Sequence, residues 1–427
     1  MCLGKQSTSS RFLSAFTIFV RMKRLVFLLL FGIWMSSALG QKEQSIVVSD
    51  KLQTLRCGDL IVPVRVGATD TAMYYPRLAG KRVALLANHT SMIGERHLVD
   101  ILHARGFDVT AIFAPEHGFR GTADPGEHVE GFVDAATGIP IRSLYDGNTR
   151  RPSDEAMHSF DVLVVDMQDV GVRFYTYYIA MLRMMDACAD FGQAVIVLDR
   201  PNPNGMVVDG PILEKRYESG VGAIPVPVLH GLTMGEIARM AVGEGWVSPC
   251  DLTVVPCRNY THRIRYELPV APSPNLRTQR AVYLYPSVCL FEGTVLSVGR
   301  GTDKPFEVYG HPDLPPVRYP YAFTPRPSAG AKDPLWNGRL CFGRDLSRES
   351  CDSVLRRGLG LEYLIEAYRE LNLGEHFFKP VFEKLIGVGY VRRMIVEGYS
   401  ADEIRSRWQE DVELFRIQRK PYLLYEE

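Results

Sequence analysis

The sequence predicts an α/β protein, with a Rossmann-like, doubly wound and mostly parallel sheet followed by a smaller α+β domain. Between about residues 80 and 245, short apolar runs rich in β-branched residues alternate with longer amphipathic segments. Continuous apolar runs are typical of strands covered on both faces, and their alternation with helices is typical of parallel sheets. Beyond Trp246, proline and glycine become frequent, which indicates a change of architecture.

The N-terminal segment reads MKRLVFLLLFGIWMSSALGQ from Met22, with two basic residues, an apolar run and small residues up to Gly40. This layout is typical of a secretory signal peptide. The run is too short to span a bilayer as a stable helix. We therefore expect residues 1–40 to be a leader, with translation starting at Met22 and cleavage near Gly40. The mature protein is expected to be periplasmic or secreted, with no membrane attachment.

The elements of the first predicted domain, residues 41–245, follow in order. Strands are expected at 82–87, 108–114, 161–166 and 194–199, and helices at 95–105, 176–192 and 234–244. Thr233 and Glu236 form a capping-box pattern before the last of these helices. The dinucleotide fingerprint G-x-G-x-x-G follows none of the strands. The Rossmann-like shape therefore carries no nucleotide signal, and no cofactor is expected.

The second predicted domain covers residues 246–427. An amphipathic helix is expected over 361–371, and a final helix is opened by the pattern Ser400-x-x-Glu403. Its buried face is expected to carry Ile404, Trp408, Val412 and Phe415.

Composition excludes several classes of protein. The chain has 49 basic and 49 acidic residues without a basic block, so nucleic acid is not expected as a partner. Its eight cysteines, seven after the leader, form no C-x-x-C pair. This pattern argues against a zinc cluster and against a disulfide-rich scaffold. Nothing in the sequence fixes the oligomeric state.

Polar side chains gather where the four predicted strands end. In an open parallel sheet, ligands bind outside the carboxyl ends of the strands. We therefore expect one crevice to receive the following residues from the four strand ends in turn: Asn88 and His89; Glu116 and His117; Asp166, Gln168, Asp169, Arg173 and Tyr175; Asp199, Arg200 and Asn202.

Glu116 is the strongest catalytic candidate, because Pro115 fixes the backbone before it and Gly118 lets the chain approach closely. The other residues also have structural interpretations. In chain order, these are a turn at Asn88, loop capping by Asp166, pairing of Arg173 with Asp166 or Asp169, a core position for Tyr175 and an ion pair between Asp199 and Arg200.

The second half contributes further candidates. Asn275 lies in the proline-stiffened loop APSPNLRT, Glu292 lies at the end of an expected strand, and Arg300 lies in a glycine-rich turn. Polar loops from both halves predict an active site in a cleft between the domains.

Several of these motifs resemble one family, the exo-acting β-N-acetylmuramidases of bacteria (NamZ-like glycoside hydrolases). The resemblance runs from about residue 80 to the C-terminus and rests on FAPEHGFRG, QDVGVRFYTY, VLDRPNP, HGLTMGE, PSPN and GRGT-x-PFE. The chain departs from the family pattern at Ser91, at Pro125 and over 295–298, where no carboxylate is present at Val298.

The resemblance implies hydrolytic release of N-acetylmuramic acid from the non-reducing end of peptidoglycan fragments. Glycoside hydrolysis needs one carboxylic acid and a second group that attacks or activates water. Glu116 is expected to be the acid, and Asp166, Asp169 and Glu292 compete for the second role. Arg173, or alternatively Arg300, is expected to bind the lactyl carboxylate of the sugar.

Two other functions stay open at this point. A metal-dependent hydrolase would hold a divalent ion with His117, Asp166, Asp169 and His230, although the spacing matches no metalloprotease motif. A non-catalytic periplasmic sugar-binding protein could have a similar two-domain cleft and would bind muropeptides without turnover. In the muramidase interpretation, His230 is a further expected substrate-binding residue.

Overall fold

The computed structural model describes residues 54–57, 60–115, 119–120, 133–144 and 151–427. Its centre is a six-stranded sheet in the order β10-β9-β8-β3-β6-β7, in which every neighbouring pair is parallel. The strands are β3 (Arg82–Ala87), β6 (Asp108–Ala114), β7 (Ile141–Ser143), β8 (Val162–Asp166), β9 (Ala194–Leu198) and β10 (Asp251–Val255). The four predicted strands are confirmed to within one residue at each end.

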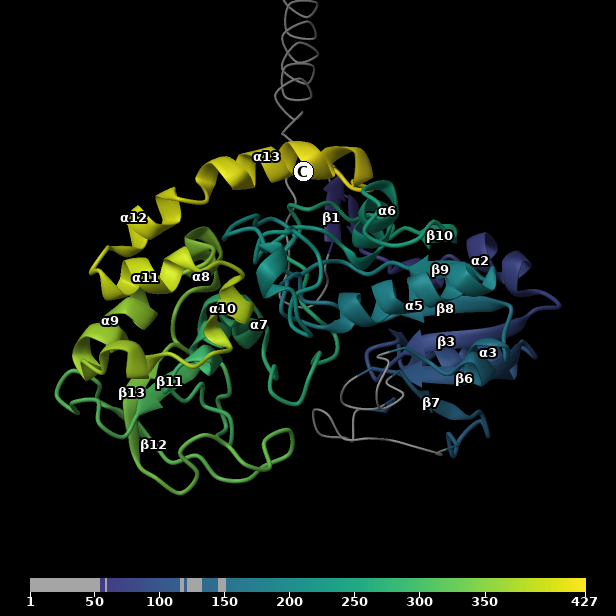
Figure 1. The fold of residues 1–427 in the computed structure, drawn as a ribbon. Coiled ribbons are helices and arrows are strands. Elements are labelled where there is room, and N and C mark those ends of the chain that lie inside the picture. Colours follow the sequence, from purple (N-terminus) through teal and green to yellow (C-terminus); the bar gives the residue numbers. More distant parts are fainter. Residues whose placement is uncertain (1–53, 58–59, 116–118, 121–132, 145–150) are drawn as a thin grey trace, which may run out of the picture.

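Helices cover both faces of the sheet (Figure 1). On one face, alternate strand residues pack with α2 (Thr71–Leu78) and α3 (Leu98–Ala104). On the other face, the intervening strand residues pack with α4 (Asp154–Met157), α5 (Tyr177–Phe191) and α6 (Met234–Gly243). The strands are apolar throughout because both of their faces are buried, so the predicted doubly wound sheet is confirmed.

Two helix starts show how local sequence sets the elements. The predicted capping box is present at α6, where Thr233 accepts from the Glu236 amide and Glu236 reaches back to the Thr233 amide. The helix predicted from residue 95 begins later, at Leu98, because residues before it form a short hairpin of β4 (Met92–Ile93) and β5 (Arg96–His97).

The sheet continues past the boundary predicted near residue 245. β10 pairs with β9 along its whole length, so the predicted second domain supplies one edge strand. The apolar core that packs α5 and α6 also continues into the second half, where it includes Phe291, Phe306 and Tyr309.

The second half combines a small antiparallel sheet with many short helices. The sheet has the order β11 (Val308–His311), β13 (Cys341–Asp345), β12 (Tyr321–Phe323). The helices are α7 (Gln279–Val288), α8 (Cys351–Arg357), α9 (Glu362–Leu371), α10 (Phe382–Ile386), α11 (Tyr390–Val396), α12 (Ala401–Ser406) and α13 (Gln409–Arg419). The expected strand ending at Glu292 is wrong, because these residues form the 3₁₀ helix η3 (Cys289–Gly293) that continues α7.

The final helices run from the second half back to the first (Figure 1). The capping box at Ser400 and Glu403 opens α12, and the predicted buried face is confirmed, with Ile404, Trp408, Val412 and Phe415 at most 2% exposed. After α13 and η5 (Lys420–Tyr422), Arg239 of α6 donates to the carbonyl of Tyr422.

The remaining described elements are the hairpin β1 (Thr54–Cys57) and β2 (Leu60–Pro63), and the 3₁₀ helices η1 (Gly67–Thr69), η2 (Lys215–Tyr217) and η4 (Gly374–Phe377). None of the helices described here combines the length and apolar character needed to cross a bilayer.

Candidate active site

The carboxyl ends of the central strands bring residues from separate loops to one edge of the sheet. Ala87 pairs with Asp166, so Asn88 directly follows the point where β3 and β8 meet. Leu86 pairs with Phe113 of β6 on the other side. The predicted Glu116 and His117 come after β6 but lie outside the described residues. The described site is therefore built from the ends of β3, β8 and β9.

Asp166 and Arg200 form a buried ion pair across this edge. Arg200 donates from Nε to Oδ1 of Asp166 at 2.6 Å and from Nη2 to Oδ2 at 3.0 Å, and their side chains are 3% and 0% exposed. Both oxygens of Asp166 accept from Arg200, and Nη2 of Arg200 also donates to the carbonyl of Met92 at 3.0 Å. The ion pair links the ends of β8 and β9 and differs from the Asp199–Arg200 pair considered above, and the catalytic role of Asp166 and the binding role of Arg200 stay predictions.

Asp199 instead anchors the C-terminus. Its carboxylate accepts from the hydroxyls of Thr233 and Tyr425, both at 2.6 Å, and from the amide of Gly235 at 2.8 Å. Burial raises the pKa of Asp199 to about 6. The strand-end loop after β9 is thereby held by residues that lie far away in sequence.

Asp169 is the carboxylate of this edge that keeps an unpaired oxygen. Its Oδ1 accepts from the amide of Gly171 at 2.6 Å, whereas its buried Oδ2 has no partner. Burial raises the pKa of Asp169 to about 7. Gly171 has φ +75°, and a Cβ there would lie 2.0 Å from the side chain of Asn202, so the loop requires glycine. Asp169 can therefore exchange a proton near neutral pH.

Asn88 is oriented by a chain of hydrogen bonds. The backbone amide of Gln168 donates to Thr90 Oγ1 at 2.9 Å, and the Thr90 hydroxyl donates to Asn88 Oδ1 at 2.6 Å. This arrangement leaves Nδ2 of Asn88 buried without an acceptor. The side chain of Gln168 donates to the carbonyls of Asp169 and Pro201, so Gln168 positions the loop.

A loop of the second half closes against these residues. His89 Nε2 lies 2.8 Å from the carbonyl of Ala271, and the hydroxyls of Tyr175 and Tyr177 donate to the carbonyl of Pro272 at 2.8 and 3.1 Å. In the same loop, Asn275 donates from Nδ2 to Gly330, leaving its buried Oδ1 unpaired. Tyr175 thus positions this loop and is only 7% exposed.

Four buried polar atoms on these contacting segments have no partner among the described residues: Asn88 Nδ2, His89 Nδ1, Asp169 Oδ2 and Asn275 Oδ1. Buried polar groups normally have hydrogen-bond partners, so these atoms are the candidates for contacts with a ligand or with water. His89 was expected at this edge, from the polar run NHTS directly after a buried strand, but no role in the site was predicted for it.

Arg173 does not lie among these groups. Its Nη1 donates to the carbonyls of Pro211 and Val226, and its Nη2 to those of Leu385 and Ile386, at 2.7 to 3.0 Å. The side chain is 0% exposed, and burial lowers its pKa to about 10. The expectation that Arg173 binds a substrate carboxylate is corrected, as is its pairing with Asp166 or Asp169, because its guanidinium is occupied by main-chain carbonyls.

Two further predicted residues are internal. Asn202 donates to Leu232 at 2.9 Å and accepts from the amide of Asn204 at 2.8 Å. His230 is fully buried and accepts from the amide of Leu232 at Nδ1, so its Nε2 carries the proton. Burial lowers the pKa of His230 to about 3, so it is neutral. Asn202 joins the loop after β9 to the loop before α6, and His230 forms its bond within the latter loop, with its Nε2 unpaired.

Arg300 and Glu292 form a half-exposed pair in the second half. Nε of Arg300 donates to Glu292 at 2.6 Å, and the two side chains are 29% and 32% exposed. The guanidinium of Arg300 lies 5.0 Å from the ring centre of Phe306. Phe306 contacts Tyr285, and Tyr285 contacts Tyr175, with ring centres 5.0 and 6.0 Å apart. This aromatic series connects Arg300 to the strand-end loops.

The proposed metal ligands do not converge in the part of the chain that the structure describes. There, no group of three or more histidine, cysteine, aspartate or glutamate side chains has a geometry suited to a metal ion. His117 lies outside the described residues, so that part of the metal hypothesis stays a prediction.

Comparison with known proteins identifies the family. Residues 83–280 match the description "Exo-beta-N-acetylmuramidase NamZ, N-terminal", and residues 283–425 match its C-terminal counterpart. The chain is 38% identical over 379 residues to the peptidoglycan beta-N-acetylmuramidase NamZ of Bacillus subtilis, covering 82% of this chain and 89% of that protein.

Two solved structures from Bacteroides fragilis, both DUF1343 family proteins, share the fold. One has 54% sequence identity and a TM-score of 0.80, and the other has 28% identity and a TM-score of 0.70. Each match covers 85% of this chain and 99% of the solved chain. The chain therefore belongs to the exo-beta-N-acetylmuramidase NamZ family.

Proposed function

We propose that this chain hydrolyses the terminal N-acetylmuramic acid from the non-reducing end of peptidoglycan fragments, and that the strand-end loops hold the bond that is cleaved. The observation that carries the proposal is Asp169, a buried carboxyl with a pKa of about 7 and one unpaired oxygen, on a loop joined to that of Asn88. The Bacillus subtilis relative is a peptidoglycan beta-N-acetylmuramidase, which supports the same class of reaction.

Asp169 is the best choice for the second catalytic group. Asp166 is neutralised by Arg200, and Glu292 is paired with Arg300, whereas Oδ2 of Asp169 is free to face a substrate or a water molecule. As a nucleophile or general base, Asp169 acts in its ionised form. Glu116 keeps its proposed role as the general acid on the grounds of its sequence context.

The remaining unpaired groups give the substrate its contacts. The Nδ2 donor of Asn88 and the Oδ1 acceptor of Asn275 match the hydroxyl and acetamido groups of an N-acetylated sugar. Among the two candidate arginines, Arg300 takes the role of binding the lactyl carboxylate. Of the guanidinium nitrogens of Arg300, only Nε forms a hydrogen bond with a described residue. The two Nη nitrogens can therefore donate two parallel hydrogen bonds to a carboxylate.

Export completes the proposal. The leader pattern over residues 22–40 supports release into the periplasm or the medium, where peptidoglycan is found.

Product analysis tests the reaction. Purified protein is incubated with a peptidoglycan digest, and the products are separated and weighed by mass spectrometry over time. Free N-acetylmuramic acid as the first product supports the proposal. Release of disaccharides or longer fragments first would contradict exo-action. Binding without any turnover would favour the non-catalytic alternative, and loss of activity on chelation would favour the metal-dependent one.

A further inference from the structure

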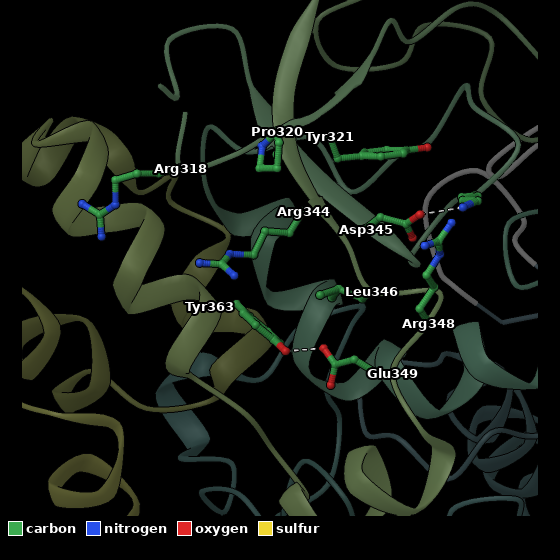
Figure 2. A pocket seen from close by; sticks show the side chains of 11 residues that line it. Arg318, Pro320, Tyr321, Arg344, Asp345, Leu346, Arg348, Glu349 and Tyr363 are labelled. Atoms are coloured by element: carbon green, nitrogen blue, oxygen red, sulfur yellow. Dashed lines mark hydrogen bonds and ion pairs between the residues drawn. The ribbon is translucent and has the colours of Figure 1, made fainter. Parts of the chain in front are cut away.

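A second candidate site lies in the second half of the chain. It is a pocket of about 640 Å³ formed by the turn that carries Lys304, by β12 and β13 with their flanking loops, and by Tyr363 of α9 (Figure 2). None of the strand-end residues described above lines it. Its volume falls within the range of about 300 to 1,000 Å³ that is typical of small-ligand sites.

The two acidic residues of the pocket are already neutralised. Asp345 pairs with Lys304 at 2.7 Å, and Glu349 pairs with Arg357 at 2.7 Å. Glu349 also accepts a hydrogen bond from the hydroxyl of Tyr363 (Figure 2). These contacts leave neither carboxylate available to attract a cation.

The basic residues exceed the acidic ones. Arg318, Arg344 and Arg348 line the pocket in addition to Lys304, and Figure 2 shows Arg318 and Arg348 on opposite sides of it. Arg318 and Arg344 pair with Glu370 and Glu366. Arg348 is exposed, and no described residue forms a hydrogen bond or an ion pair with its side chain. The pocket therefore has an available guanidinium, which suits a carboxylate.

The pocket is linked to Arg300 through the chain and through α7. Arg300 and Lys304 lie on the same turn, four residues apart, which limits the distance between their Cα atoms to about 14 Å. Thr278, at the start of α7, donates to Glu307 at the end of this turn. Arg280 of α7 donates to the carbonyl of Ser347, next to Arg348. The pocket thus lies within reach of a glycan that is bound at Arg300.

We propose that this pocket is a subsite for a carboxylate carried by the substrate beyond the cleaved bond, with Arg348 as its main contact. The inference rests on the proposed function. Two sources supply the same chemistry there, namely the lactyl group of the next muramic acid and the terminal carboxylate of a stem peptide. Tyr321, Tyr363 and Leu346 offer apolar surface to either group.

Calorimetric titration of the full protein tests this subsite with three probes. The first is N-acetylglucosamine linked to N-acetylmuramic acid with a free lactyl group, the second is the same disaccharide with a stem tetrapeptide, and the third is uncharged chitobiose. Arg348→Ala should weaken binding of a carboxylate probe about three- to tenfold, as loss of one partly exposed charged contact does. The affinity for chitobiose should not change, and the probe that is affected identifies the source.

Arg356→Ala is the matched control. Arg356 is an exposed arginine eight positions away that does not line the pocket, so its removal should leave all three affinities unchanged. Equal affinities of the Arg348→Ala and Arg356→Ala proteins for both carboxylate probes would overturn the subsite. Turnover of a chromogenic muramide, which has no sugar beyond the cleaved bond, is measured in parallel. Failure of that turnover would reject the proposed function, whereas the binding result reports on the pocket alone.

Discussion

Arg173 donates from Nη2 to the carbonyl of Leu385 at 3.0 Å, which joins the loop after β8 to α10 across 212 positions of the chain. Gly387, with φ +84°, makes room for the guanidinium, because a Cβ there would lie 2.4 Å from Nη2. The arginine thus fixes the second half against the loop that carries Asp169.

Replacing Arg173 by methionine should therefore lower stability and not specificity. Four buried carbonyls would lose their donor, which costs about 3 kcal/mol or more of unfolding free energy. Turnover of muramides and of glucosaminides should fall alike. Urea unfolding and kinetics on both substrates measure these effects, and Arg77→Met, at an exposed position of α2, is the control. Selective loss of muramide turnover with unchanged stability would return Arg173 to the binding site.

Arg300→Met should instead change specificity. Loss of the fork removes the partner of the lactyl carboxylate, so kcat/KM on N-acetylmuramides should fall about tenfold or more, while the low activity on N-acetylglucosaminides should change little. Arg300→Lys should recover only part of the loss, because it keeps the charge but not the bidentate geometry. Arg326→Met serves as the control. Arg326 is exposed, and its backbone amide donates to the carbonyl of Gly301. Parallel losses on both sugars would rule out this role.

Asp169→Asn should raise stability above neutral pH. Burial raises the pKa of Asp169 from 3.8 to about 7, so between these values the folded protein binds more protons than the unfolded chain. The contribution of Asp169 to stability therefore falls as pH rises through this window and is least favourable above pH 7. Asparagine stays neutral and keeps the acceptor for the Gly171 amide. The melting temperature of the variant relative to wild type should increase from pH 5 to pH 8, and a difference that is independent of pH would contradict the assignment.

Export is predicted from the leader. N-terminal sequencing of the mature protein from fractionated cells should give a start close to residue 41 in the periplasm or the medium. A cytoplasmic protein that retains Met22 would disprove it.

The sequence predicted the central sheet well because its signal is local. Runs such as RVALLA and DVTAIFA are strands in full, since both faces of the sheet are buried. In the central sheet, β7 was missed because it has only three residues, too few for a period to show, and β10 was not among the predicted strands either. β12 of the smaller sheet also has only three residues and was missed for the same reason. The prediction of a strand at Glu292 was wrong because Pro286 interrupts the helical pattern of α7 in the sequence. The helix therefore was not recognised, nor was its continuation as η3.

The site was predicted less completely, because partner choice depends on distant residues. The strand ends correctly predicted that Asn88 and Asp166 lie close together. They could not show that Arg200 forms an ion pair with Asp166 while Oδ2 of Asp169 has no partner. The role of Arg173 was decided by Leu385 and Ile386, which no local pattern connects with it. Ion pairing with Arg200, and not residue type or burial, distinguishes Asp166 from Asp169.

The catalytic role of Asp169 is tested most directly by the pH profile of kcat/KM on a chromogenic N-acetylmuramide. The profile is measured for the wild type, for Asp169→Asn and for the control Asp108→Asn, which changes an exposed residue at the amino end of β6. The wild type and the control should lose activity as pH falls through about 7, because Asp169 must be ionised to act. Asp169→Asn should lose about 10² to 10⁴ in rate and show no such limb. A variant that keeps near-normal turnover with the same limb would contradict the account.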